Sequence, residues 1–326
     1  MDAFLGMSTE DQRAAYARAE SNTRLPAASI EKDLWVCWTL RELFALPEIG
    51  PHLTFKGGTS LSKGFGIIER FSEDLDLKIE PGTVTELPKV ANWKSEGKSA
   101  TRERQAYFEA LLRVMFVPGA ELRQDDARRD PAHRSAEIRV EYPGRHHGDL
   151  GGVLKPFVLL EVGNARVTPF VACDLSSFVH DYLAARNMQS GYTDNRPRGV
   201  RCVHPLVTLL EKLDALRRRA VNENAEPATF VRHYGDAARI VGAEARLPPL
   251  SGYANVRELA EELLRQRQIG ALPAEDDPAF ALASGPRTEA VRRAHVAIAP
   301  MFWGARVSLG DACAAIRAWI RLRVPG

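Results

Sequence analysis

Two short segments of the sequence combine residue types that suit phosphate and metal-ion chemistry. The first contains, in succession, Lys56, Gly57, Gly58, Thr59 and Ser60. Where a strand ends at two glycines and a helix begins, the first backbone N–H groups of the helix lack partners and can bind phosphate oxygens. Glycine lets a phosphate approach the backbone closely, because it has no Cβ atom. Together with the two hydroxyl groups, this segment predicts a phosphate-binding site.

The second segment carries two carboxylates, Asp74 and Asp76, which alternate with Leu75 and Leu77. Alternation of this kind predicts a strand with one apolar and one charged face, so both aspartates point to the same side. Two adjacent carboxylates repel each other unless a cation lies between them, and a site made of oxygen ligands favours Mg²⁺. A phosphate-binding segment beside such an acid pair is the arrangement that nucleotidyl transfer requires.

Each segment alone has a simpler interpretation. Two successive glycines occur more often in a tight turn than in a phosphate site, and an isolated D-x-D pattern usually lies on a solvated strand face. Here a strand leads through G-G-T-S into a helix, and a second strand with D-x-D follows. Because this combination arises much less often by chance, we interpret the two segments as one nucleotide site.

Hydrophobic patterning predicts the elements that position these residues. The elements expected in the first part of the chain are helices over 28–46, 59–70 and 101–117, strands over 53–55, 71–80, 136–142, 157–162 and 168–172, and a polar turn or hairpin loop over 125–134. Further helices are expected over 205–219, 228–240, 256–266 and 310–322. We therefore expect an α+β fold with a core over 1–175 that includes N-terminal helices. A mainly helical C-terminal domain over 176–326 is expected to complete the active-site cleft.

The composition is that of a globular protein: 326 residues, 45% hydrophobic, with 44 Lys and Arg against 42 Asp and Glu. These values exclude a disordered or collagen-like chain, and the near-zero net charge argues against a dedicated DNA-coating protein. No apolar run is long enough for a membrane helix, and the N-terminus lacks the features of a signal peptide, so a cytoplasmic protein without membrane contact is expected. The four widely spaced cysteines argue against a zinc ribbon and predict buried free thiols.

The segments K-G-G-T-S-L-S-K (56–63) and R-F-S-E-D-L-D-L (70–77) resemble the signature of the DNA polymerase β-like nucleotidyltransferase superfamily. More narrowly, they resemble the AbiEii-type toxins of abortive-infection and toxin–antitoxin systems. Three further segments resemble this family in the same order: E-K-D at 31–33, E-K-L-D-A-L at 211–216 and R-H-Y-G-D at 232–236. The resemblance implies a nucleotidyltransferase-type mixed β-sheet core with flanking helices.

The resemblance also implies roles for single residues. Thr59 and Ser60 would contact the triphosphate of an NTP, within the nucleotide-binding segment that begins at Lys56. Asp74 and Asp76 would hold Mg²⁺, or Mn²⁺ in its place. These assignments agree with the chemistry that the residue types and their spacing suggest.

Three residues further along the chain complete the implied site. Lys212 would neutralise phosphate charge, and Asp236 would lie near the nucleotide or the metal shell. Glu161 is our candidate for the third carboxylate of the superfamily, because it is an acid flanked by apolar strand residues. The alternatives are a solvated helix lysine at Lys212, a pair of Asp236 with Arg232 or Arg239, and a pair of Glu161 with Arg139 or Arg166. Gly235 departs from the family pattern, in which a bulkier residue is common at this place.

The expected reaction transfers a nucleoside monophosphate from an NTP to an acceptor hydroxyl and releases pyrophosphate. The resemblance implies an RNA acceptor, in particular the 3′ end of tRNA, and a cognate antitoxin protein as partner. The basic residues that could bind RNA, or form scattered solvated charges, are Arg123, Arg128, Arg129, Arg134, Arg139, Arg145 and Arg217–Arg219. Two alternatives stay open: a small-molecule or protein acceptor, and a catalytically inactive module that senses NTP and acts through a partner.

Overall fold

The chain forms two compact units. The computed structural model describes residues 4–23, 25–70, 74–80, 82–128, 130–146, 155–164, 167–188, 196–299 and 302–325. The first unit comprises Met1–Gly64 and Ser72–Cys202, and the second comprises Phe65–Phe71 and Val203–Gly326. The division thus falls near residue 202, whereas the sequence suggested 175. The reason is that a strand close to residue 202 pairs with the strand that precedes the two glycines.

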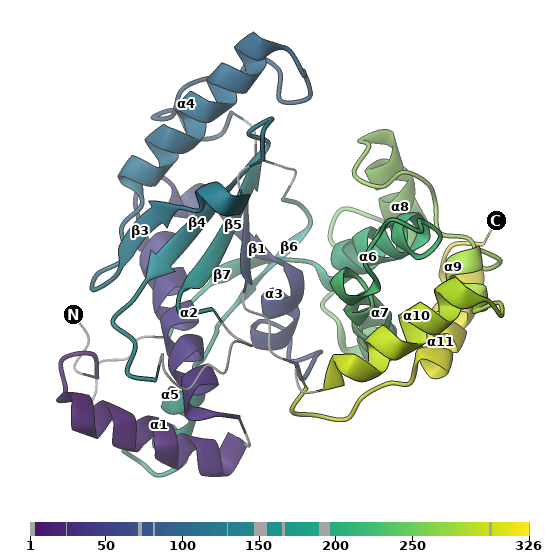
Figure 1. Ribbon diagram of the computed structural model, residues 1–326. Helices are drawn as coiled ribbons and strands as arrows, with labels where there is room; N and C mark the ends of the chain where they lie inside the picture. The colour runs from purple at the N-terminus through teal and green to yellow at the C-terminus, as the bar shows by residue number, and fades with distance from the viewer. Residues whose placement is uncertain are drawn as a thin grey trace. The chain divides into compact units, whose positions relative to one another are not determined.

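The first unit is built on a mixed sheet (Figure 1). Within the described residues it has seven strands in the order β3-β4-β5-β2-β1-β7-β6. Their bounds are β1 Leu53–Lys56, β2 Asp74–Ile79, β3 Glu121–Gln124, β4 Ser135–Glu141, β5 Val158–Asn164, β6 Phe170–Cys173 and β7 Val200–Val203. Strand β2 is antiparallel to β1 and parallel to β5, while β1 and β7 are parallel and β4 is antiparallel to both β3 and β5. The acid-bearing strand β2 therefore lies in the interior of the sheet, and the predicted α+β class is confirmed.

Strand β2 has the two faces that its sequence predicts. Leu75 and Leu77 are completely buried, whereas Asp74 and Asp76 are partly exposed on the opposite face. Because side chains alternate along a strand, burial of the leucines in the core fixes the side on which both carboxylates lie. A slip of one residue in the register would bury the aspartates instead, so the hydrophobic core itself holds the acids at the surface of the sheet.

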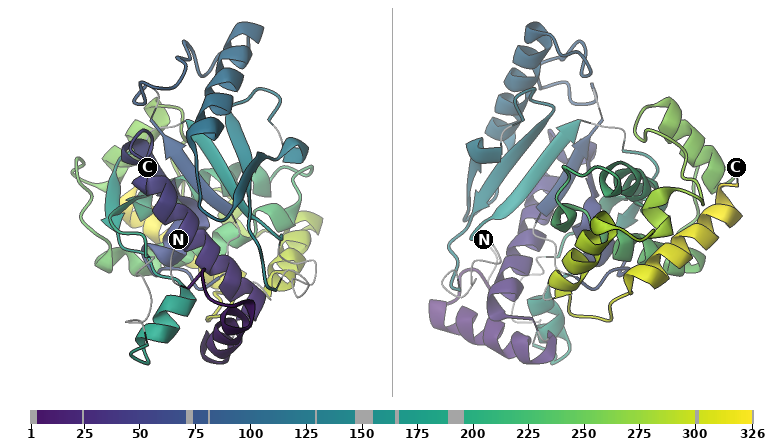
Figure 2. Two further views of the ribbon diagram at one scale, coloured as in Figure 1. Left: turned by 90° about the vertical axis from the view of Figure 1, so that its left-hand side faces the viewer. Right: turned by 45° about the vertical axis from the view of Figure 1, so that its right-hand side comes forward.

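Five α-helices accompany the sheet in the described part of the first unit: α1 Thr9–Thr23, α2 Ala27–Ala45, α3 Gly57–Lys63, α4 Lys98–Val114 and α5 Phe178–Ala184. Helix α2 contacts β5, and α1 and α5 contact α2 and each other (Figure 2). Nearly all of α2 is buried, in agreement with apolar residues around most of its circumference. Helix α3 ends at Lys63, earlier than the sequence suggested. Gly66 has φ +59, and a right-handed helix cannot continue through a residue with positive φ.

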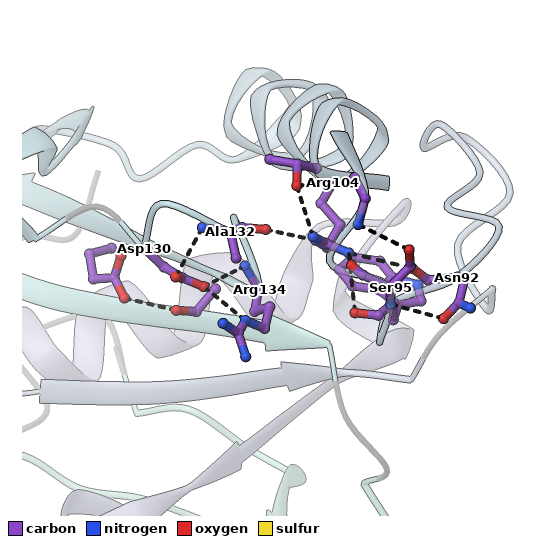
Figure 3. Close-up of polar contacts among 11 residues, drawn as sticks. Asn92, Ser95, Arg104, Asp130, Ala132 and Arg134 are labelled. Carbon is purple, nitrogen blue, oxygen red and sulfur yellow. Dashed lines mark hydrogen bonds and ion pairs between the residues drawn. The ribbon is translucent and has the colours of Figure 1, made fainter. Parts of the chain in front are cut away.

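A buried arginine fastens the loop after β2 to helix α4 (Figure 3). Arg104 is 0% exposed and donates hydrogen bonds to the carbonyl oxygens of Ser95 and Ala132, each at 2.8 Å. In the neighbouring turn, the Asp130 carboxylate accepts the backbone N–H groups of Ala132 at 3.1 Å and of Arg134 at 2.8 Å. These bonds satisfy the buried guanidinium and close the turn between β3 and β4.

The described part of the second unit is helical, as the sequence predicts. Its α-helices are α6 Pro205–Ala220, α7 Arg232–Ala243, α8 Val256–Arg265, α9 Pro278–Ala281, α10 Pro286–Ala297 and α11 Leu309–Arg323. Helix α6 contacts α7, α8 and α9, and α11 contacts α7 and α9. The segment 65–71 joins this unit through Arg70, whose backbone forms an isolated β-bridge with Phe302.

Two further expectations concern the whole chain. Among the described residues, no helix has both the length and the apolar character that a membrane span needs. The four cysteines are free and buried, as their spacing predicts.

Candidate active site

The Asp76 carboxylate lies directly against the turn that follows β1. Lys56, the last residue of β1, is opposite Asp76 in the ladder between β1 and β2, and Gly57 comes next. Gly57 has φ +81, and a Cβ atom at this position would be 1.8 Å from Oδ2 of Asp76. Glycine alone meets both conditions, because it adopts positive φ readily and leaves this space to the carboxylate.

The two hydroxyl groups of the glycine-rich segment have partners inside the protein. Thr59 donates a hydrogen bond of 2.8 Å to the backbone carbonyl of Asp74, which ties α3 to β2. Ser60 is 1% exposed, and its hydroxyl is hydrogen-bonded to the thiol of Cys202. Lys56, the residue before α3, makes no side-chain capping hydrogen bond to the helix, and binding of phosphate by the first backbone N–H groups of α3 stays a prediction. The contact of the two hydroxyl groups with a triphosphate stays a prediction.

Asp74, Asp76 and Glu161 lie together on one face of the sheet. Glu161 on β5 is directly opposite Asp76 on β2, and Asp74 precedes Asp76 by one repeat of the pleat. Burial, together with the charge of Glu161, raises the pKa of Asp76 to about 6. An acid whose ionised form is disfavoured in this way gains from any cation that binds beside it.

The donor set of this face fits a divalent cation. Oδ1 of Asp74 is buried and accepts no hydrogen bond from the described residues, although the Lys155 ammonium lies 3.6 Å away. No group of three or more potential metal-ligating side chains is gathered within the described ranges, so the protein offers an acid pair rather than a closed cage. Carboxylate oxygens from two residues, completed by water and phosphate oxygens, are the usual coordination of Mg²⁺.

Two lysines near these acids were not recognised from the sequence. Lys155 pairs with Asp74, and Lys78 on β2 lies with its ammonium 3.6 Å from Oε1 of Glu161. Lys78 is thus an ion-pair partner of Glu161, while Arg139 pairs with Asp125 and Arg166 lies outside the described residues. The i+2 spacing from Asp76 to Lys78 was the available signal for this second lysine, since it places both on one strand face.

The E-K-D segment of α2 braces the surroundings of the site. Glu31 accepts two backbone N–H groups from the loop after β4, at 2.6 and 2.8 Å. Lys32 donates to the backbone carbonyl of Lys155 at 3.1 Å, and Asp33 pairs with Lys63 of α3 at 2.5 Å. All three α2 side chains are buried, and each charge is satisfied by a different segment. The motif therefore holds α3 and the start of β5 against one helix.

In the second unit, Lys212 and Asp236 belong to one buried polar cluster. The Asp236 carboxylate accepts two hydrogen bonds from Arg70, at 2.7 and 2.8 Å, and one from Lys212 at 2.8 Å. The Lys212 ammonium also lies 3.3 Å from Nδ1 of His233. Arg70 and Asp236 are 2% and 1% exposed, so this pair is almost completely removed from water. Asp236 thus joins α7 to α6 and to the segment 65–71.

The charges of this cluster are set by burial and by one another. Burial opposes ionisation of Asp236, but the adjacent Arg70 and Lys212 hold its pKa well below the ordinary value. Burial lowers the pKa of Lys212, and the charge of Asp236 partly offsets this effect. Burial and the Lys212 charge lower the pKa of His233 well below its ordinary value, so the imidazole is neutral. Arg70 and Lys212 thus keep the Asp236 carboxylate ionised inside the protein.

Most of the arginines considered for RNA binding are paired with carboxylates. Arg123 pairs with Glu121, and Arg139 with the buried Asp125 at 2.7 Å. The other such pairs are Arg134 with Asp130, and Arg217 and Arg218 with Asp214. Arg129 and Arg166, and the side chain of Arg128, lie outside the described residues. These ion pairs reduce the net positive charge that the arginines could offer to an RNA backbone.

Comparison with known proteins adds independent information. The model of the family described as "Nucleotidyl transferase AbiEii toxin, Type IV TA system" matches residues 38–308. Among solved structures, MenT4, a nucleotidyltransferase toxin from Mycobacterium tuberculosis H37Rv, is similar with TM-score 0.41 and 19% identity, over 94% of this chain and 99% of that one. JHP933 from Helicobacter pylori is similar with TM-score 0.42 and 13% identity, over 90% of this chain and 89% of that one. No curated protein sequence matches the chain.

Proposed function

Because the chain belongs to the AbiEii family of nucleotidyl transferase toxins of type IV toxin–antitoxin systems, we propose that Asp74 and Asp76 are its catalytic acids. The observation that carries this proposal is the contact between the Asp76 carboxylate and Gly57. An acid with a purely structural role on a strand face would not require its neighbour to be a glycine with positive φ, as Gly57 is here. A site that brings a carboxylate and phosphate-binding N–H groups together does need one.

The proposed cofactor is Mg²⁺, with Mn²⁺ as a substitute, held by Asp74 and Asp76. When bound, the cation would polarise the α-phosphate and stabilise charge on the leaving oxygen. The buried Oδ1 of Asp74, which accepts no hydrogen bond within the described residues, supports its role as a ligand. Loss of either aspartate is expected to lower the rate by several orders of magnitude, because charge stabilisation is usually the largest catalytic contribution.

The proposed reaction is a single displacement at the α-phosphate of an NTP. The acceptor hydroxyl oxygen forms a bond to the α-phosphorus as the bond to the bridging oxygen of pyrophosphate breaks. Glu161, or one of the two aspartates, accepts the proton of the hydroxyl group. The backbone N–H groups at the start of α3, with the Lys56 ammonium, bind the phosphate oxygens and orient the leaving group.

Lys212 is proposed to neutralise triphosphate charge, as the family resemblance implies. Its ammonium is already desolvated, and an ammonium removed from water interacts more strongly with a phosphate than a solvated one does. Asp236 is proposed to act through Lys212, because its carboxylate accepts three hydrogen bonds from Arg70 and Lys212. In this proposal Asp236 holds the Lys212 ammonium in place and is not a ligand of the metal ion.

The acceptor is proposed to be RNA, with the 3′ end of tRNA as the first candidate, and the partner that neutralises the toxin is proposed to be a cognate antitoxin. Both proposals rest on the family. The ion-paired arginines do not support extensive contact with an RNA backbone, so recognition of a short RNA end fits these residues better than a long duplex interface.

The test is a transfer assay with purified protein. The protein is incubated with each α-³²P-labelled NTP, Mg²⁺ and total tRNA, in parallel with a cell extract separated into protein and small-molecule fractions. Label is expected in tRNA with the intact protein, and in none of the fractions with the Asp74→Asn, Asp76→Asn variant. Binding of tRNA is measured at increasing salt, where contacts to phosphate predict a fall in affinity.

The outcomes separate the candidate functions. Label in protein or in a small molecule would show that the acceptor is not RNA, and the assignment of the two catalytic aspartates would stand. Bound NTP without transfer to any fraction would favour a module that senses NTP. Transfer that persists in the double variant would refute the assignment of the two aspartates.

A further inference from the structure

Lys78 occupies the position on β2 that follows the acid pair. It lies two residues after Asp76 and therefore on the same face of the sheet. Its side chain is 12% exposed, and its ammonium is 3.6 Å from Oε1 of Glu161. Glu161 is directly opposite Asp76 in the parallel ladder, and its negative charge raises the pKa of Asp76 more than that of Asp74 does. The Lys78 ammonium therefore lies near the two carboxylates that repel each other most strongly.

The neighbouring strand leaves room for this ammonium. Gly163 on β5 is opposite Lys78 in the ladder, and a Cβ atom at Gly163 would be 2.8 Å from Nζ of Lys78 and 3.4 Å from its Cδ. Glycine in the interior of a strand weakens the strand, and it often marks a place where another group approaches closely. Here that group is the side chain of Lys78, which lies across the glycine toward Glu161.

We propose that the Lys78 ammonium is the resident counter-ion of Asp76 and Glu161 and that it lowers the affinity of the acid pair for a free divalent cation. The inference rests on the proposed function, in which Asp74 and Asp76 hold the metal. A positive charge this close to the acids offsets part of their repulsion when no metal is bound, and it repels a divalent cation that approaches alone. A cation that arrives bound to an NTP carries the negative charge of the triphosphate with it and meets less repulsion.

Other charged groups on this face do not replace Lys78. Lys56 on β1 is opposite Asp76, and Lys155 pairs with Asp74. Neither residue is changed in a Lys78 variant, so the change in charge is confined to the position beside Glu161. Lys78 is therefore a positioning residue that acts through the acids.

The test measures binding of Mn²⁺ alone to the full-length, nucleotide-free protein, by loss of the free Mn²⁺ signal in electron paramagnetic resonance. Lys78→Met is expected to bind Mn²⁺ about tenfold more tightly than the unmodified protein, because one charge near the site is removed. Lys98→Met, which removes an exposed lysine at the start of α4, changes the net charge equally and is expected to leave the affinity unchanged. Gly163→Ala keeps every charge but displaces the ammonium, and it is expected to tighten Mn²⁺ binding by a smaller factor.

The controls separate this inference from the proposed function. If Asp76→Asn loses Mn²⁺ binding while Lys78→Met binds as the unmodified protein does, the counter-ion role is refuted and the acid pair stands. If neither the unmodified protein nor Lys78→Met binds Mn²⁺ alone, the inference is refuted, whereas the proposed metal site, whose coordination the phosphate oxygens of an NTP complete, stands. Thermal unfolding checks that each variant folds, and if Lys78→Met does not fold, Gly163→Ala decides the question.

Discussion

The contact between Gly57 and Asp76 makes the Gly57→Ala variant a sharp test of the site. Alanine at φ +81 costs about 1–2 kcal/mol of stability, because its Cβ is strained in the left-handed region. The new Cβ would also lie 1.8 Å from Oδ2 of Asp76, whereas real contacts of this kind are not shorter than 3.0 Å. The carboxylate must therefore move by more than 1 Å. A displacement of about 1 Å in an active site typically lowers the rate about 100-fold, so kcat/KM is expected to fall by this factor.

Gly82→Ala is the matched control. Gly82 has φ +76, close to the value at Gly57, but a Cβ atom there would meet nothing within 4 Å. Both variants pay the same backbone strain, and only one disturbs Asp76. Urea unfolding is expected to show a loss of stability for both proteins, larger for Gly57→Ala because its Cβ also displaces the Asp76 carboxylate, while steady-state transfer assays show loss of activity for Gly57→Ala alone. Equal activity in the two variants would refute the role of Asp76 that we derive from this contact.

Three further predictions concern the buried charges. Arg70→Met leaves the Asp236 carboxylate with one cation and is expected to cost about 3–5 kcal/mol in urea unfolding, whereas Arg123→Met at an exposed pair has no measurable effect. Lys212→Met keeps the bidentate pair of Arg70 and Asp236; KM for NTP is expected to rise at least about tenfold, and an unchanged KM would refute its phosphate role. Asp76 has a pKa of about 6 when folded, above the ordinary value of 3.8, so its contribution to stability is present below about pH 4 and lost as pH rises to about 6. Thermal melts without divalent cation are expected to show this loss in the unmodified protein and a flatter profile in Asp76→Asn; identical slopes would contradict the pKa.

Local patterns in the sequence were sufficient for the centre of the fold. The alternation of leucine with aspartate fixes β2 and the face of its acids, because a strand with one buried side tolerates only one register. The two glycines at the start of α3 were also recognisable, since the chain must change direction where a strand passes into a helix. Glu161 could be chosen because one acid interrupts an apolar run, and the ladder brings it opposite Asp76.

The remaining features depend on contacts between distant parts of the chain. Strands β3 and β7 were not predicted; β3 has only one apolar residue, Leu122, and therefore shows no alternation of apolar and polar residues. The pair of Arg70 with Asp236 joins residues 166 positions apart, and nothing in the sequence near Arg70 indicates which acid it meets. Lys155 was not predicted for the same reason. Its backbone is held by a hydrogen bond from Lys32 of α2, a residue far away in the sequence. Burial of such groups becomes visible only once the packing is known.

The central claim is that the acid pair on β2 transfers a nucleotide, and the most direct test couples two products of one reaction. Pyrophosphate release and incorporation of α-³²P label into tRNA are measured in the same mixture for the unmodified protein, Asp76→Asn and Glu141→Gln. Glu141 lies on β4 of the same sheet and pairs with the exposed Arg123, so its variant controls for the loss of one acid. We predict that the unmodified protein and Glu141→Gln each release one pyrophosphate for every labelled nucleotide incorporated. Asp76→Asn is predicted to form neither product. Formation of both products by Asp76→Asn at the unmodified rate would contradict the claim.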